Sequence, residues 1–247
     1  MRWKNRSICR TGWSMRSKTL DRLAALAQEK QPTARVVRIS DGQETLVRPD
    51  RVEGDFDAPS DVIVAAREAL RIDRSGIVPH GNERYFIHVH NPPRRMIIVG
   101  AVHISQPLVA MAREAGFDVT VIDPRGAFAT VERFPDVTLM DDWPDDAMGA
   151  LKLDTRTAVV TLTHDPKIDD PALAAAMHSP AFYIGALGSR KTHASRLIRL
   201  RDQGFDSGKL DRIHGPIGLN LGGRAPAEIA VSILAEALMT LHGGNVK

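Results

Sequence analysis

The pattern of hydrophobic and polar residues changes near residue 94. Beyond that point, short runs such as Met96–Val99 and Ala158–Leu162 are apolar throughout, and the segments between such runs carry apolar residues every three or four positions. Strands without polar alternation, separated by helices, are typical of a parallel sheet that is covered on both faces. The pattern therefore predicts an α/β fold with a Rossmann-like, doubly wound parallel sheet in residues 94–247.

The elements of this domain are expected to follow one another without an internal repeat. The expected strands are Met96–Val99, Asp118–Ile122, Val137–Met140, Ala158–Leu162 and Ala181–Ile184. The expected helices are Ile104–Ala115, Asp170–Met177, Ser189–Gln203 and Pro226–Leu241, with a turn region at His214–Gly223. No apolar run approaches the roughly 18 residues that cross a membrane, so no contact with a membrane is expected.

A smaller α+β region, residues 18–93, precedes this domain. Its expected elements are a helix from Lys18 to Lys30, a hairpin that turns at Asp41-Gly42, a helix that has Ser60 as its N-cap and ends near Gly76, and a strand from Glu83 to His90. The segment Asn91-Pro92-Pro93 then interrupts the strand pattern. Two adjacent prolines are typical of a linker, and we place the domain boundary there.

Composition narrows the class of protein. The chain has 43% hydrophobic and 26% charged residues, which is ordinary for a globular domain. A single cysteine, Cys9, excludes an internal disulfide framework and a Cys-rich metal site, and it favours a cytoplasmic location. The 5% of aromatic residues are not interleaved with the basic ones, so a nucleic-acid partner is not expected.

Two stretches of the chain are rich in basic residues. Residues 1–17 form a basic arm without the apolar block of a secretory signal, and we assign it no function. A second cluster, which includes Arg190, Arg196, Arg199 and Arg201, follows a glycine-containing turn. The second cluster is the better placed of the two to contact an anionic ligand.

The strongest candidate for a binding site is a pair of glycine-rich turns. In the first, Gly185 and Gly188 permit unusual backbone angles, Ser189 can cap the next helix, and Arg190 and Lys191 supply positive charge. Backbone N–H groups at the start of a helix favour phosphate or another anion. A purely structural turn with two solvated cations is the alternative.

The second turn runs from Pro216 to Pro226 and is expected to face the first across the sheet edge. Its glycines are Gly218, Gly222 and Gly223. Ala225, just before Pro226 at the first helical position, is a poor N-cap, which suggests that the N–H groups near it serve another partner or water.

The turn after the first strand of the α/β domain is an incomplete dinucleotide fingerprint. Only Gly100 occupies a glycine position of the G-x-G-x-x-G pattern, whereas Val102 and Ser105 replace the other two. Asp123 lies where an acidic residue would contact a ribose, and Arg125 could meet a phosphate instead. This combination argues against standard NAD(P) binding, and a helix N-terminus without a nucleotide is equally compatible with it.

Histidines are the remaining candidates. His164 and Asp165 follow a strand at the edge where open α/β sheets collect ligands, and His103 faces the same edge from the first turn. Alternatively, Asp165 starts a turn and the histidines are exposed. His88 and His90 share one face of a strand, but no carboxylate or cysteine pattern completes a site, so no metal is predicted.

These motifs, taken in order, resemble the XdhC/CoxI family of accessory factors for xanthine dehydrogenase, carbon monoxide dehydrogenase and related molybdenum hydroxylases. The resemblance covers roughly residues 83–241. It is carried by the segments Arg94–His103, Val121–Arg125, Leu162–Lys167, Ile184–Lys191 and Pro216–Leu219, followed by Pro226–Ala230.

The resemblance implies a chaperone of the molybdopterin-type molybdenum cofactor, with or without an attached nucleotide, rather than an enzyme. The partners it implies are an apo molybdenum hydroxylase and a cysteine desulfurase that supplies sulfur, with a homodimer as a candidate assembly. The residues expected around the cofactor are Gly100, His103, Asp123, Arg125, His164, Asp165, Gly185, Gly188, Ser189, Arg190, Lys191, Gly218, Gly222 and Gly223.

The N-terminal region departs from the family pattern. The G-S-x-P-R-like start and the G-G-x-x-E-like segment of full-length members are absent between Met1 and Pro93. Three alternatives follow: the chain is a divergent paralogue, it obtains the missing half of the usual cofactor site from a second polypeptide, or it binds a different ligand. Two other functions stay open: an NAD(P)-dependent oxidoreductase, and a docking module that binds partner proteins without a ligand.

Overall fold

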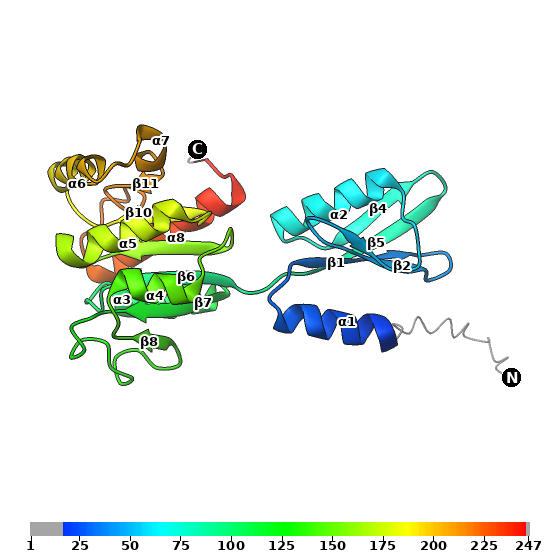
Figure 1. Cartoon of the computed structure of the whole chain (residues 1–247), viewed down its shortest axis with the longest axis horizontal. Helices are drawn as coiled ribbons and strands as arrows, with labels where there is room; N and C mark the ends of the chain where they lie inside the picture. Colours follow the sequence, from blue (N-terminus) through cyan, green and yellow to red (C-terminus); the bar gives the residue numbers. More distant parts are fainter. Residues whose placement is uncertain (1–16, 246–247) are drawn as a thin grey trace, which may run out of the picture. The chain divides into compact units, whose positions relative to one another are not determined.

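The computed structural model describes residues 17–245, which form two compact units. The first unit ends at Pro92 and the second begins at Pro93 (Figure 1). The predicted basic arm lies outside the described residues except for Ser17, which is the first residue of a helix.

The first unit contains a five-stranded antiparallel sheet and two helices. In chain order its elements are α1 (Ser17–Gln28), β1 (Thr33–Arg38), β2 (Glu44–Val47), β3 (Val52–Glu53), α2 (Ser60–Ile72), β4 (Gly76–His80) and β5 (Glu83–His90). The strands pair in the order β3-β2-β1-β5-β4. The predicted helices, hairpin and last strand are confirmed, whereas β3 and β4 were not expected.

The two helices of this unit cover opposite faces of its sheet (Figure 1). Neighbouring residues of a strand point to opposite faces, so Leu46 packs with Leu23 of α1 while Val47 packs with Val62 of α2. One expectation is wrong: the N-cap of α2 is Pro59, which makes no side-chain cap hydrogen bond, and Ser60 is already helical.

The second unit contains a six-stranded parallel sheet. Its elements are β6 (Arg94–Val99), α3 (Ser105–Glu114), β7 (Phe117–Ile122), β8 (Thr138–Met140), α4 (Pro144–Leu151), β9 (Thr157–Thr161), α5 (Pro166–His178), β10 (Tyr183–Ala186), α6 (Arg190–Asp202), α7 (Ser207–Leu210), β11 (Ile213–His214) and α8 (Pro226–His242). The strands pair in the order β11-β10-β9-β6-β7-β8. Strands β7 and β8 add on one side of β6, and the chain then crosses over to add β9, β10 and β11 on the other side, as in a Rossmann sheet.

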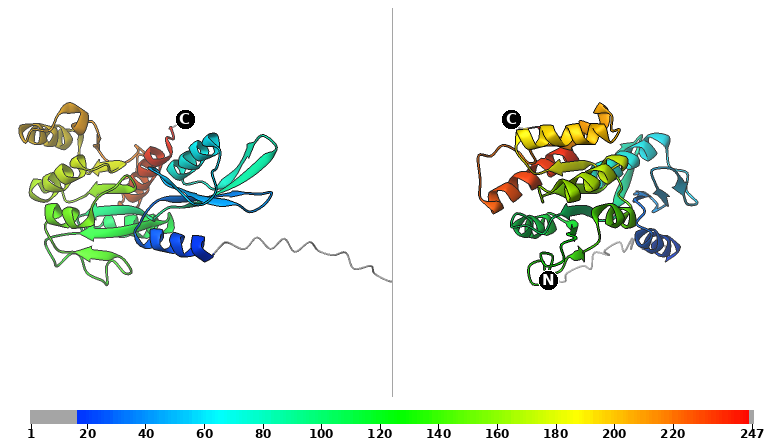
Figure 2. Two further views of the ribbon diagram at one scale, coloured as in Figure 1. Left: turned by 45° about the vertical axis from the view of Figure 1, so that its right-hand side comes forward. Right: turned by 60° about the vertical axis from the view of Figure 1, so that its left-hand side comes forward.

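Helices cover both faces of the parallel sheet (Figure 2). Helices α3 and α8 bury one face together with Ile98 and Val160, and α4, α5 and α6 bury the other together with Ile97 and Val159. Alternate residues of the central strands thus feed two separate cores, because successive side chains of a strand point to opposite faces. The predicted Rossmann-like, doubly wound fold is confirmed.

Several element boundaries differ from those expected. Helix α5 begins at Pro166 rather than at Asp170, because the Asp165 carboxylate caps it by accepting from the Lys167 N–H at 2.9 Å. The short helices α4 and α7 and strand β11 were not predicted. In α4 the apolar pattern is only about two turns long, too short for periodicity to identify.

Gly185 does not belong to a turn. It lies inside β10, is buried, pairs with Val160 of β9, and is not among the residues with positive φ. A Cβ at this position would overlap the side chain of Ile217 and lie 2.8 Å from Tyr183 Cε1. The prediction that Gly185 permits an unusual backbone angle is therefore wrong, and the absence of a side chain serves packing instead.

We predict that Gly185→Ala destabilises the second unit by about 1–3 kcal/mol, because the added methyl overpacks a buried site. The matched control is Gly149→Ala in α4, where a Cβ meets no atom within 4 Å. The control should be neutral or stabilising by roughly 0.5–1 kcal/mol, since alanine favours helix. Thermal unfolding of both variants checks this, and equal melting temperatures would contradict the packing argument.

Candidate functional site

Most of the site residues predicted in the second unit lie in or next to turns at the carboxyl edge of its parallel sheet. The turns after β6, β7, β9 and β10 all leave the sheet at this edge, and it is where open α/β sheets collect ligands. Each turn contains residues predicted from the sequence. The contacts of these residues show which of them are free to meet a ligand.

The turn after β6 closes on itself. Gly100 has φ of 110°, and a Cβ there would lie 2.6 Å from Cγ2 of Thr163 in the neighbouring turn. The Ser105 hydroxyl donates to the Gly100 carbonyl at 2.5 Å and accepts from the Val102 N–H at 3.3 Å. Gly100 therefore allows two turns to approach each other closely, and Ser105 occupies the N–H group that a pyrophosphate would need.

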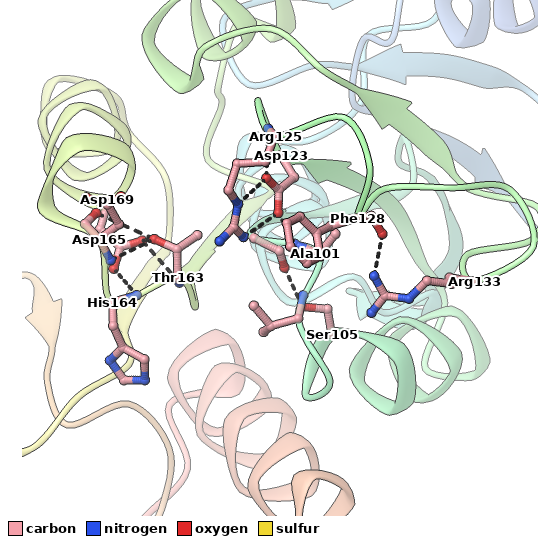
Figure 3. Close-up of polar contacts among 12 residues, drawn as sticks. Ala101, Ser105, Asp123, Arg125, Phe128, Arg133, Thr163, His164, Asp165 and Asp169 are labelled. Atoms are coloured by element: carbon pink, nitrogen blue, oxygen red, sulfur yellow. Dashed lines mark hydrogen bonds and ion pairs between the residues drawn. The ribbon is translucent and has the colours of Figure 1, made fainter.

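Asp123 and Arg125 satisfy each other. The Asp123 carboxylate is fully buried and accepts from Arg125 Nε at 2.8 Å, from Arg125 Nη2 at 2.7 Å and from the Ala101 N–H at 2.8 Å (Figure 3). Burial alone would raise the pKa of Asp123, but these hydrogen bonds outweigh it and lower the pKa. The Asp123 carboxylate is therefore not available for the ribose contact that was expected, and Arg125 uses Nε and Nη2 to hold that carboxylate.

The turn after β9 is organised by a residue that sequence reasoning missed, Asp169. One oxygen of its buried carboxylate accepts from Thr163 Oγ1 at 2.7 Å, and the other accepts from the His164 N–H at 3.1 Å (Figure 3). Burial raises the pKa of Asp169, and the hydrogen bonds offset only part of that shift. An acid in the first turn of a helix is common, so no sequence signal distinguished Asp169 from a solvated charge.

His164 does not contact its predicted partner, Asp165, through its ring, and no partner was predicted for His103. His164 has φ of 63°, which places its ring away from the Thr163–Asp169 hydrogen bonds (Figure 3), and His103 lies on the turn after β6. The Asp165 carboxylate caps α5 and makes no hydrogen bond to the His164 ring within residues 17–245. The expectation that Asp165 orients His164 is therefore not met.

Arg196 connects the turns after β9 and β10. Its side chain is 2% exposed, and its Nη2 donates to the Leu187 carbonyl at 2.8 Å and lies 3.7 Å from Oδ2 of Asp169. In the sequence Arg196 is one member of a basic cluster. The fold buries Arg196 and leaves Arg201 of the same helix exposed, a difference that the sequence pattern does not show.

The first glycine turn leaves backbone N–H donors at the start of α6 without an acceptor among the described residues. Gly188 has φ of 148°, and Ser189 caps α6 by accepting from the Thr192 N–H at 3.1 Å, as predicted. Arg190 and Lys191 are exposed in the first turn of α6, which holds no acidic residue. Their backbone N–H groups have no acceptor among the described residues, so this helix start offers both N–H donors and positive charge.

Two glutamates of α8 accept several of the backbone N–H groups of the second glycine turn. The Gly218 N–H donates to Oε2 of Glu236 at 2.8 Å, and the N–H groups of Arg224 and Ala225 donate to Oε2 of Glu228 at 2.8 and 2.9 Å. The expectation that the donors near Ala225 serve another partner or water is therefore wrong, because Glu228 takes them.

Gly218 also closes a packing contact: it has φ of 89°, and a Cβ there would overlap the Ser232 hydroxyl. Gly222 has φ of 78° and open space around it, whereas a Cβ on Gly223 would lie 2.6 Å from Cβ of Glu228. The N–H groups of Gly222 and Gly223 find no acceptor in the part of the chain that the structure describes.

The two glycine turns line one cleft of about 540 Å³. Leu187 and Arg190 come from the first turn, residues 216–224 form the opposite wall, and Glu228, Ile229 and Ser232 of α8 complete it. The cleft brings together Arg190, Gly218, Gly222 and Gly223 of the predicted residues. Lys191, although next to Arg190, lines a different hollow.

The structure brings no metal site together in residues 17–245, where no three His, Cys, Asp or Glu side chains cluster. His88 and His90 lie on one face of β5 with ring centroids 4.1 Å apart, as a two-residue spacing requires. No helix of the same residues is both long enough and apolar enough to cross a bilayer.

Comparison with known proteins identifies relatives of this chain. A Bacillus subtilis protein, named as a probable xanthine dehydrogenase subunit, is 33% identical over 168 residues, which are 66% of this chain and 48% of that protein. "Molybdenum cofactor insertion chaperone PaoD" of Escherichia coli is 32% identical over 152 residues, 61% of this chain and 42% of PaoD. An Escherichia coli protein, YqeB, is 32% identical over 62% of this chain and 28% of its own length.

The chain thus spans less than half the length of each of these relatives. Among solved structures, a Bacillus halodurans protein described as a xanthine dehydrogenase superposes with a TM-score of 0.71 at 24% identity, over 92% of this chain and 67% of that one. That similarity concerns the fold. Residues 96–237, more than half of the chain, match the XdhC Rossmann domain. The chain therefore belongs to the XdhC family.

Proposed function

We propose that this protein binds the molybdenum cofactor and delivers it to a molybdenum hydroxylase. The observation that carries the proposal is the cleft between the two glycine turns, with Arg190 and unengaged N–H groups at its wall. Two relatives point the same way by name, one as a molybdenum cofactor insertion chaperone and one as a probable xanthine dehydrogenase subunit.

The donors of the cleft fit the phosphate end of a molybdopterin. The Arg190 guanidinium can form a bidentate contact with a phosphate, and the N–H groups of Gly222 and Gly223 lie on the opposite wall. The start of α6 adds a partial positive charge. Leu187, Leu221 and Ile229 supply apolar surface beside these donors, as a flat organic ring system requires.

In this proposal the chain's own residues hold and shield, while the bound cofactor supplies the redox chemistry of the client enzyme. Glu228 and Glu236 keep the wall in shape by accepting backbone N–H groups, so the wall does not have to form upon binding. Burial would raise the pKa of Glu236, but hydrogen bonds from His214, Tyr183 and the Gly218 N–H outweigh it and lower the pKa, which keeps this acceptor ionised.

We infer the remaining roles from membership of the family. The client is an apo molybdenum hydroxylase, and a cysteine desulfurase supplies the terminal sulfur, because Cys9, the single thiol, lies outside the region that matches the family. The protein acts in the cytoplasm as a chaperone rather than an enzyme. A second polypeptide or a second copy of this chain, as in a homodimer, supplies the part of the cofactor site that residues 18–93 lack.

We expect molybdenum to co-elute with the protein after anaerobic incubation with cofactor released from a molybdenum hydroxylase. Gel filtration followed by metal analysis measures this. Cofactor incubated without the protein is the control and should leave the protein-sized fractions free of molybdenum. If the wild-type protein elutes without molybdenum, the proposed function fails in this form.

Arg190→Ala should weaken cofactor retention by about tenfold or more, because it removes a charge-assisted hydrogen bond to a phosphate. Arg201→Ala is the matched control, since Arg201 is an exposed arginine at the other end of the same helix. Retention is measured by molybdenum content per protein. Unchanged delivery together with weaker partner binding in Arg190→Ala would favour the docking module and remove the ligand from this cleft.

An NAD(P)-dependent oxidoreductase is the second candidate, because the fold is shared with that class. The internal partners of Ala101, Val102 and Asp123 count against it. We expect no saturable binding of NADH or NADPH at micromolar concentrations in a fluorescence titration, with a known dehydrogenase as the positive control. Micromolar binding accompanied by hydride transfer would reverse the order of the two candidates.

A further inference from the structure

A second hollow lies on the other side of the first turn of α6. It encloses about 270 Å³ and is lined by His164, Pro166, Asp169, Lys191, Thr192, Ser195, Arg196 and Arg199. Arg190 lines the glycine-turn cleft and its neighbour Lys191 lines this hollow, because successive residues of a helix point about 100° apart. The proposed cofactor cleft therefore does not use these residues.

Arg196 borders the hollow with hydrogen-bonding capacity that the protein does not use. Its side chain is only 2% exposed, yet neither Nε nor Nη1 has a hydrogen-bond partner within the described residues. Only Nη2 is engaged, by the Leu187 carbonyl. Burial lowers the pKa of Arg196, although a guanidinium stays protonated at neutral pH, so two donors of a buried cation lack an acceptor. Such an arrangement costs free energy unless an acceptor enters.

The charges around the hollow favour an anion as that acceptor. Asp169 is the one carboxylate that lines it; its oxygens accept from Thr163 and His164, and Oδ2 lies 3.7 Å from Nη2 of Arg196, the nitrogen that is already engaged. Arg199 is paired with Asp170, Nε to Oδ2 at 2.7 Å. Lys191 makes no ion pair among residues 17–245, and it is exposed at the rim.

We propose that this hollow is a binding site for a tetrahedral oxyanion, such as phosphate, held by Arg196 from inside and Lys191 from the rim. A planar guanidinium matches two oxygens of a phosphate, and an ammonium adds a point charge. Nε and Nη1 of Arg196 are shielded from bulk solvent and lack an acceptor among the described residues, and in this proposal the guanidinium turns toward the hollow to meet the anion. The volume suits a small anion or the terminal phosphate of a larger ligand. The hollow shares no lining residue with the proposed cofactor cleft, so the proposal does not rest on the binding of the cofactor.

Binding of the anion in the hollow is also expected to affect the cofactor cleft through the backbone. Arg196 holds the Leu187 carbonyl, and Leu187 lines the glycine-turn cleft. A guanidinium that turns toward an anion changes its contact with that carbonyl. Occupancy of the hollow is therefore expected to alter the backbone environment of the turn at Leu187.

The first test is a phosphate titration of the full chain followed by nitrogen-15 NMR, with ionic strength held constant by chloride. We expect saturable shifts of the Arg196 side-chain Nε–H signal, and of the Leu187 and Gly188 amides. A merely structural Arg196 would leave its Nε–H signal unmoved. Absence of saturable binding at millimolar phosphate overturns the proposal.

The second test compares neighbouring residues on α6. Lys191→Ala should weaken phosphate binding by about tenfold, since it removes a charge-assisted contact, whereas Arg190→Ala should leave it within about twofold. Both residues are exposed, so neither variant is expected to impair folding. Equal losses in the two variants would mean that the anion binds at the helix start in general, which contradicts a site in the hollow.

The source of the oxyanion is distinguished by a parallel titration with phenyl phosphate. Binding as tight as that of inorganic phosphate means that the hollow accepts the terminal phosphate of an organic molecule. Much weaker binding, with inorganic phosphate still bound, means that the hollow selects the free anion. Both results support an oxyanion site, whereas binding of phenyl phosphate that survives Lys191→Ala unchanged would contradict it.

Discussion

The carboxyl edge of the parallel sheet depends on the buried carboxylate of Asp169. It accepts from the Thr163 hydroxyl and the His164 N–H, and it faces Arg196, which in turn holds the Leu187 carbonyl. A buried carboxylate without these donors would be too costly to retain, and removing it would leave Arg196 as an unpaired buried cation. The turns after β9 and β10 therefore keep their positions together, and the surfaces on either side of α6 depend on both.

At several places along this edge, carboxylates of the protein accept backbone N–H groups that would otherwise be open to a ligand. Asp123 accepts from the Ala101 N–H and Glu228 accepts from two N–H groups of the second glycine turn. In dinucleotide-binding folds, N–H groups of the turn after the first strand approach a pyrophosphate. In this protein Asp123 and Ser105 accept from those N–H groups. The start of α6 instead offers an anionic ligand positive charge and N–H donors that have no acceptor among the described residues. Its first turn carries two cations and no acid.

The start of α6 serves two surfaces rather than one. Arg190 faces a cleft of about 540 Å³ and Lys191 a hollow of about 270 Å³. The larger space suits an organic cofactor with a phosphate end, and the smaller suits a single oxyanion. Leu187 lines the first and is held by Arg196 of the second. Two ligands could thus influence each other across one turn of backbone.

Sequence alone determined the parallel sheet, the cap at Ser189 and the family, because apolar periodicity, capping chemistry and ordered motifs are local properties. Only the tertiary structure decided what each polar residue does. Gly185 has no room for a side chain because Ile217 lies against it. Asp123 and Arg125 form an ion pair with each other. Arg196 and Arg201 have the same side chain, yet only one is buried. Burial arises from contacts between distant segments, and no local pattern encodes it.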